Sequence, residues 1–122
     1  MAHRVLGRAY ESKRMYGEAM EEFRKGGSRS SLAYVLAISG KQAEARKILQ
    51  EVQREARTSH VGHSSLALIL VGLGETKRAV AELEAADRAG EPLDHLNVDR
   101  RFNSLRSDRG FLALLRAHGF SL

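Results

Sequence analysis

Histidines and serines are the residues of this chain whose types could support catalysis or metal binding. His60 and His63 stand three positions apart, which places two imidazoles on one helical face, but no Cys, Asp or Glu stands beside them to complete a metal site. His95 and His118 have no neighbouring nucleophile, and the Gly-Gly-Ser stretch at 26–28 lacks the Lys-Ser/Thr pair of a phosphate-binding loop. There is no cysteine, which excludes thiolate chemistry and disulfides. We therefore predict no enzyme activity, no catalytic residue, no metal site and no cofactor.

The composition is typical of a single globular domain. The chain has 122 residues, of which 43% are hydrophobic and 29% charged, enough for one modest core. Its longest apolar stretch, residues 64–74, is far shorter than the roughly 20 residues that a bilayer crossing needs. The N-terminus lacks the apolar segment of a signal peptide. We expect a cytoplasmic protein with no membrane partner.

The formal net charge of +5 raises the question of nucleic-acid binding. The charge is dispersed: residues 44–57 alternate basic and acidic side chains, as on a solvated helix face, and residues 75–91 are mainly acidic. Neither aromatic–basic interleaving nor a helix-turn-helix pattern accompanies it. Nucleic-acid binding is therefore disfavoured.

Three segments, 6–23, 32–49 and 66–83, align without a gap. Each begins with two large residues four positions apart, the apolar stripe of a helix, and has a small residue behind the first of them. Gly40 and Gly74 then supply the left-handed residue of a helix C-cap, and in the helix that follows a small residue precedes a large one by one turn. The columns are Leu6/Leu32/Leu66, Gly7/Ala33/Ala67, Tyr10/Leu36/Leu70, Ala19/Ala45/Ala79 and Phe23/Leu49/Leu83.

These columns resemble the tetratricopeptide repeat (TPR) family, whose pattern is Leu-Gly-x-x-Tyr, a turn glycine and Ala-x-x-x-Phe. The second and third copies are also 34 residues apart, which is the family period. Arg14 stands in the glycine column of the first copy, there is no tryptophan, and Pro92 falls one place late. The resemblance implies an all-α fold, a superhelical stack of three TPR-like hairpins at about 2–26, 30–58 and 60–91.

The first and second copies are only 26 residues apart. We expect the missing length to come from helix ends, with Gly26 and Gly27 ending one helix early and Ser30 or Ser31 capping a shortened next helix. The first helix of the second repeat would then have about two and a half turns. It is the expected soft point of the stack.

Residues 92–122 are predicted to form a helical C-terminal cap over the flank that a last repeat leaves exposed. They contain Asp-Arg-x-Phe-x-x-Leu twice, at 99–105 and 108–114, each copy reading as a capped, half-buried helix. This tail resembles one found after TPR arrays in bacterial multidomain proteins that carry a serine/threonine kinase, an adenylate cyclase or a winged-helix regulator. Arg100 and Arg109 stand where that tail has proline. We expect the tail to cap the stack; the alternative is that it lies in the groove and blocks it.

The resemblance implies a concave groove lined by the first helix of each repeat, and a non-catalytic scaffold or adaptor that binds a protein or peptide in a bacterial cytoplasm. The lining is basic at one end and apolar toward the other, which suits an amphipathic helix or an extended apolar peptide with an acidic end. The predicted partner-binding residues are Arg4, Arg8, Glu11, Tyr34, Ile38, Val61, Leu68 and Val71.

Two alternatives stay open. Only five residues precede the first repeat, so we expect either a small adaptor or a piece of a longer protein, such as a regulatory or self-associating part of a kinase, cyclase or transcription regulator. A homodimer could form through the unprotected first repeat. The less favoured alternative is nucleic-acid binding through the basic surface. The identity of the partner does not follow from the residues.

Overall fold

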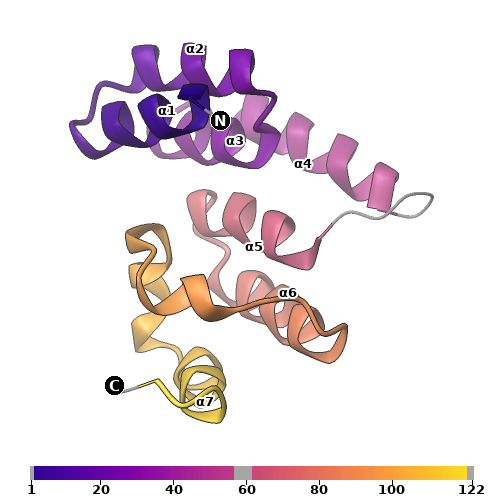
Figure 1. Cartoon of the computed structure of the whole chain (residues 1–122). Helices are drawn as coiled ribbons and strands as arrows, with labels where there is room; N and C mark the ends of the chain where they lie inside the picture. Colours follow the sequence, from indigo (N-terminus) through magenta and orange to yellow (C-terminus); the bar gives the residue numbers. More distant parts are fainter. Residues whose placement is uncertain (1, 57–61, 121–122) are drawn as a thin grey trace.

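The computed structural model describes residues 2–56 and 62–120 and is helical across them (Figure 1). No strand occurs in these ranges, which confirms the predicted all-α class. None of the helices described there is long and apolar enough to cross a bilayer. In chain order they are α1 (Ala2–Ser12), α2 (Tyr16–Gly26), α3 (Arg29–Ile38), α4 (Gln42–Ala56), α5 (His63–Gly72), α6 (Thr76–Arg88), the 3₁₀ helices η1 (Asp94–Asn97) and η2 (Arg100–Ser107), and α7 (Arg109–Ala117).

The helices from α1 to α6 pack as three consecutive pairs, α1 with α2, α3 with α4 and α5 with α6. Successive pairs meet through α2 against α3 and through α3 against α5. In Figure 1 the first two pairs form the upper part of the molecule and the third pair lies below them. The segment from η1 to α7 wraps the third pair, with η2 against α5 and α6.

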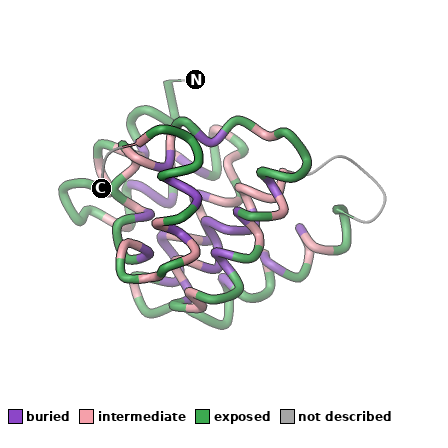
Figure 2. The backbone as a smooth tube through the Cα atoms, turned by 90° about the horizontal axis from the view of Figure 1, so that it is seen from below, coloured by how far each residue is buried: buried purple, intermediate pink, exposed green. Residues whose placement is uncertain are grey.

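Buried residues run through the middle of each pair (Figure 2), and most of the repeated columns are among them, but Leu6 of the first column is 44% exposed and does not lie in the predicted apolar stripe. Ala19, Ala45 and Ala79 are fully buried, at 0% exposure. The large residues one turn later, Phe23, Leu49 and Leu83, are at most 4% exposed. Gly7 of α1 shows why the column behind the first leucine is small, because a Cβ added there would come within 2.5 Å of the Phe23 ring of α2.

The turn between the two helices of each pair uses one left-handed residue. Gly40 and Gly74 have φ of 96° and 77°, as their column predicts. Arg14, in the same column of the first pair, adopts φ of 60°. An L side chain in this region costs roughly 1 kcal/mol relative to glycine, so the departure from the glycine column changes the energy of the turn and leaves its geometry in place.

Part of the short spacing between the first two copies is absorbed by α2, which is four residues shorter than α4; α3 is close to the predicted length of about two and a half turns but is no shorter than α5. α3 and α5 both have 10 residues, whereas α2 has 11 and α4 has 15. Gly27 ends α2 in the left-handed region as predicted, but the residue preceding α3 is Ser28, with Ser30 and Ser31 inside the helix. α3 keeps its length because residues along it, from Ser31 to Ala37, are buried against the neighbouring helices.

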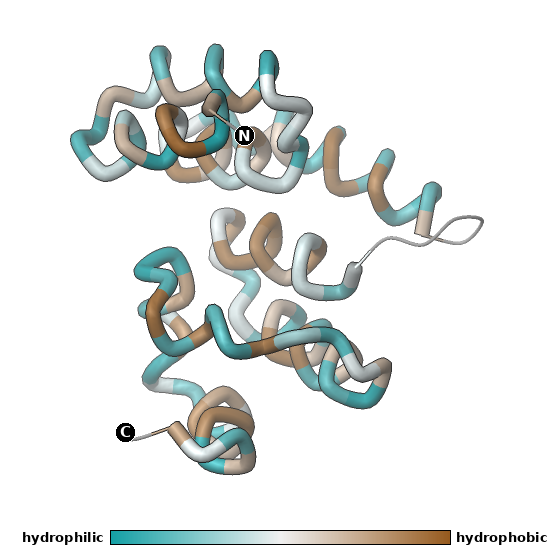
Figure 3. Tube along the Cα trace, in the orientation of Figure 1, coloured by the Kyte–Doolittle hydropathy of each residue, from teal (hydrophilic) through white to brown (hydrophobic). Residues whose placement is uncertain are grey.

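α5 is enclosed more completely than the other helices of the pairs. It has five consecutive buried residues, Leu66–Leu70, and it contacts α3, α4, α6 and η2. Figure 3 shows its strongly apolar character. A helix that is apolar all round is expected to be covered on all sides, and here the tail supplies part of the cover.

Both copies of the tail heptapeptide use aspartate as an N-cap, as predicted. Asp99 accepts a hydrogen bond from the backbone N–H of Arg101 at 3.0 Å. Asp108 accepts from the N–H groups of Gly110 and Phe111 at 2.8 and 3.1 Å. The first copy winds as a 3₁₀ helix and the second as an α-helix.

Candidate functional site

The inner faces of α1 and α3 meet the tail in a cluster of polar side chains that we call the tail–groove cluster. It consists of Arg8 and Glu11 from α1, Ser31 and Tyr34 from α3, and Asp99 and Arg101 from the tail. Three of the predicted partner-binding residues, Arg8, Glu11 and Tyr34, therefore lie together. The residues that join them from the tail are more than 60 positions away in sequence.

Asp99 is the centre of the cluster. Its side chain is only 9% exposed, and it accepts from Arg101 Nη2 at 2.9 Å and from Arg8 Nη2 at 3.3 Å. Burial raises the pKa of the Asp99 carboxyl, but the hydrogen bonds and positive charge of Arg101, with the charge of Arg8, outweigh it, so the pKa lies below its ordinary value. Asp99 is therefore an ionised carboxylate at neutral pH.

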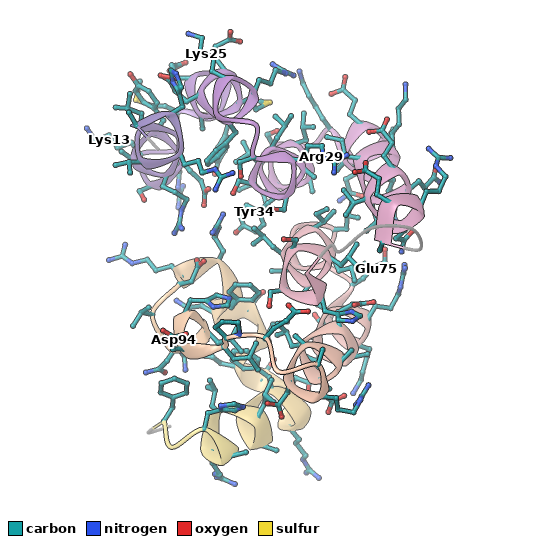
Figure 4. All side chains as sticks on the ribbon, turned by 45° about the vertical axis from the view of Figure 1, so that its right-hand side comes forward. Lys13, Lys25, Arg29, Tyr34, Glu75 and Asp94 are labelled. Carbon is teal, nitrogen blue, oxygen red and sulfur yellow. The ribbon has the colours of Figure 1, made fainter. Side chains whose placement is uncertain are left out.

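Arg101 carries the tail onto α3. Its side chain is 11% exposed, and Nη1 donates to the buried Ser31 Oγ at 3.0 Å. The guanidinium carbon lies 5.8 Å from the centre of the Tyr34 ring, within cation–π range. Figure 4 shows Tyr34 between α3 and the tail. Burial raises the pKa of the Tyr34 hydroxyl, which therefore stays neutral.

Glu11 is the least satisfied member of the cluster. Its Oε1 lies 3.8 Å from Arg8 Nε, beyond hydrogen-bond distance, and within the described ranges neither of these buried atoms has a hydrogen-bond partner. Burial raises the pKa of the Glu11 carboxyl above its ordinary value, although the charges of Arg101 and Arg8 act in the opposite direction. The cluster therefore holds a carboxylate whose ionisation the fold opposes.

The remaining predicted partner-binding residues are spread around this cluster. Arg4 is exposed and lines a pocket of about 250 Å³ together with Ser28, Arg29 and Ser30. Ile38 is 39% exposed, and Val71 is partly buried against the core. Val61 lies outside the described residues.

Leu68 lies in the core and borders a pocket. It is 5% exposed, because α5 is covered by its helical neighbours and by η2. The pocket, of about 160 Å³, lies between the tail and the first turns of α3 and α5. This pocket and the pocket at Arg4 share Ser30 and Ser65, so they adjoin each other.

The tail both covers the third pair and reaches α1 and α3, so the expectation that it only caps is incomplete. Phe111 and Leu115 are at most 1% exposed, in keeping with a cap, while Asp99 and Arg101 reach α1 and α3. Sequence reasoning missed Ser31, Asp99 and Arg101 as members of the site. The one signal available was that the two heptapeptides differ at their third position, Arg101 in one and Gly110 in the other.

His3, His63 and His118 each lie beside one carboxylate, whereas the ring of His95 packs edge-on against Phe102, with ring centroids 5.8 Å apart. His63 Nδ1 lies 2.8 Å from Glu82 Oε2, and His118 Nε2 lies 2.7 Å from Asp87 Oδ1. His60 lies outside the described residues. Over the described part of the chain, no three histidine, cysteine or acidic side chains are grouped so that they could hold a metal ion.

Comparisons with family models, with curated proteins and with solved structures found no match to this chain.

Proposed function

We propose that the chain is a TPR-type superhelical stack of three helical hairpins with a C-terminal cap, and that it is a non-catalytic module binding a segment of a partner protein. The recurrence of the same small and large residues at the centre of three successive helix pairs supports the repeat assignment. The groove would be formed by α1, α3 and α5, the first helix of each pair.

One observation carries the binding role: a polypeptide segment already lies on this surface. The tail contacts it through an ion pair to Arg8, a hydrogen bond to Ser31 and a cation–π contact with Tyr34. These are the kinds of contact by which grooves select extended peptides. Beside the tail, Ile38 and the pocket at Arg4 leave room for further contacts.

A site-specific photo-crosslinker tests the proposal. Placed at Ile38, it should form an adduct with a partner when the purified chain is mixed with host extract. Gln50, an exposed residue of α4, is the matched control position and should give no such adduct. Equal labelling from both positions, or none from Ile38, would count against a partner in the groove.

Self-association is a second candidate because two apolar side chains of α1 are exposed. Val5 is 69% and Leu6 is 44% exposed. We expect these residues to form the contact of a homodimer, which sedimentation at two protein concentrations measures. Val5→Glu should lower the mass to that of the monomer, and a wild-type mass equal to that of the monomer at both concentrations would exclude this candidate.

A further inference from the structure

The tail fits the groove incompletely, and this is the starting point of the inference. Asp99 and Arg101 bring two charges into a nearly buried position, yet Arg8 Nε and Glu11 Oε1 remain without hydrogen bonds within the described ranges. The free-energy cost of removing charged groups from water offsets most of the free energy gained when they pair. Contact between the tail and α1 and α3 is therefore weak for its size.

The contact can also be released without unfolding the tail. η2 rests on α5 and α6, with Phe102 and Leu105 at most 2% exposed. From this anchored helix, Asp99 and Arg101 extend across to α1 and α3. Rotation of the two side chains vacates the cluster at the cost of the hydrogen bond by which Asp99 caps η2, while the buried Phe102 and Leu105 stay in place.

We propose that Asp99 and Arg101 are a built-in substitute for the partner, occupying the tail–groove cluster until a segment with an acidic residue and, two positions later, an arginine displaces them. This inference rests on the proposed function and names its ligand class. The carboxylate of such a segment pairs with Arg8, and its guanidinium lies over Tyr34 with Ser31 as acceptor.

Pockets beside the cluster indicate where the displacing segment lies and which further contacts it makes. The two adjoining pockets at the first turns of α3 and α5 provide a polar channel beside the cluster. A segment in these pockets reaches Ser31 of the cluster, together with the serines at the starts of α3 and α5, Ser30, Ser64 and Ser65. An external segment can therefore make contacts along the pockets that the two tethered side chains do not.

The test uses the full chain and a fluorescent peptide of residues 96–103, Leu-Asn-Val-Asp-Arg-Arg-Phe-Asn, with binding followed by anisotropy. The tail-side variant Asp99→Asn/Arg101→Ala keeps a capping side chain on η2 and empties the cluster. We expect it to bind the peptide about tenfold more tightly than the wild-type chain, because the competing contact is gone. Arg8→Ala, on the groove side, should weaken binding by about tenfold in the same background.

If the tail occupies the site in place of a partner, the tail-side variant raises peptide affinity and the groove-side variant lowers it. If Asp99 and Arg101 make a structural contact only, both variants change peptide affinity in the same direction. Lys77→Ala/Asp108→Ala, which removes the corresponding ion pair of the second heptapeptide, is the matched control and should leave peptide affinity unchanged. A peptide with alanine in place of both charged residues at positions 99 and 101 should not bind.

Three results would overturn the inference: no gain for the tail-side variant, an equal gain for the second-heptapeptide control, or binding of the alanine peptide. Circular dichroism melts show whether each variant folds, and Arg101→Ala alone, which leaves Asp99 intact, repeats the comparison if the double variant does not. The Ile38 crosslinking assay does not use this peptide. An adduct there with no peptide binding would therefore reject the inference and leave the proposed function standing.

Discussion

The two heptapeptides of the tail, 99–105 and 108–114, share their caps and their buried residues but differ in what they touch. Phe102 and Leu105 in the first, and Phe111 and Leu114 in the second, are all at most 7% exposed. At the third position Arg101 reaches Ser31 of α3, whereas Gly110 lies so close to α6 that an added Cβ would come within 3.1 Å of Val80 Cγ1. The shared residues thus fix the tail to the helix pairs, and the residue at the third position decides whether the copy makes a polar or a close-packed contact there.

The ion pairs of the two aspartates differ in the same sense. Asp99 pairs with Arg8 at 3.3 Å and with Arg101, a partner that is itself largely buried. Asp108 pairs with Lys77 at 3.6 Å, but the Lys77 side chain is 95% exposed. Ion pairs with a solvent-exposed partner contribute little to the free energy of unfolding. Only the first copy therefore combines the cap with a buried polar contact.

The largest expected effects come from the residues that the copies share. Phe102→Ala and Phe111→Ala should each lower the free energy of unfolding by about 3–5 kcal/mol, because each leaves a cavity in the core. Urea denaturation measures both. Val98→Ala, at a side chain that is 77% exposed, is the control and should change little. A small cost for one phenylalanine alone would mean that its copy is not part of the core.

Substitutions at the third position of the heptapeptides should lower the free energy of unfolding by unequal amounts in the two copies. Gly110→Arg should destabilise by about 1–3 kcal/mol, since its Cβ meets Val80. Arg101→Ala should cost about 1 kcal/mol, because Asp99 keeps Arg8 and a backbone N–H as partners. Thermal or chemical unfolding of the two variants tests the comparison, and equal costs would refute the distinction between a close-packed and a polar copy.

Removing the caps should destabilise both copies, and the first more than the second, because Asp99→Ala also leaves the largely buried Arg101 without its carboxylate partner. Asp99→Ala frees the backbone N–H of Arg101, and Asp108→Ala frees those of Gly110 and Phe111, with an expected loss of about 0.5–2 kcal/mol from each cap. Asn at position 108 should restore most of this stability because its side-chain oxygen can accept the same bonds. An Asp108→Asn variant as unstable as Asp108→Ala would show that the negative charge matters more than the cap.

The smallest effects, below about 1 kcal/mol, concern the pH dependence of the first copy. The pKa of Asp99 is lowered in the fold, so its stabilisation is present above its ordinary value of 3.8 and is lost as the pH falls through the lowered value. The pKa of Glu11 is raised, so its favourable contribution is present below its ordinary value of 4.5 and is lost as the pH rises. Asp99→Asn should therefore destabilise and Glu11→Gln stabilise at pH 7.

Urea denaturation of these two variants at neutral and at acid pH checks the signs. Both differences from the wild-type chain should shrink as the pH falls, since the wild-type carboxyls then become neutral like their amide replacements. A Glu11→Gln variant that is less stable than wild type at pH 7 would contradict the conclusion that the fold opposes ionisation of the Glu11 carboxyl.

How far the sequence predicts this structure depends on the kind of contact. The small and large residues of the core, such as Ala45 and Leu49, recur at helical spacing, and this periodicity predicts the helix pairs. The contact between Arg101 and Ser31 spans 70 residues and involves a charged side chain, whose burial no periodic pattern indicates. The low exposure of Leu68 has the same origin, because the part of α5 that carries it is covered by η2, which follows it by some thirty residues in the chain.

Closure of the tail onto α1 changes how the chain is expected to fold and unfold. In an open repeat array each unit contacts only its neighbours, so the ends fray independently and the array melts in stages. The bond between Arg8 and Asp99, 91 residues apart, links the first helix to the last segment. Loosening of α1 and release of the Asp99 side chain then break the same contact, so a partner that displaces the tail would also let the first helix pair unfold more independently of the rest.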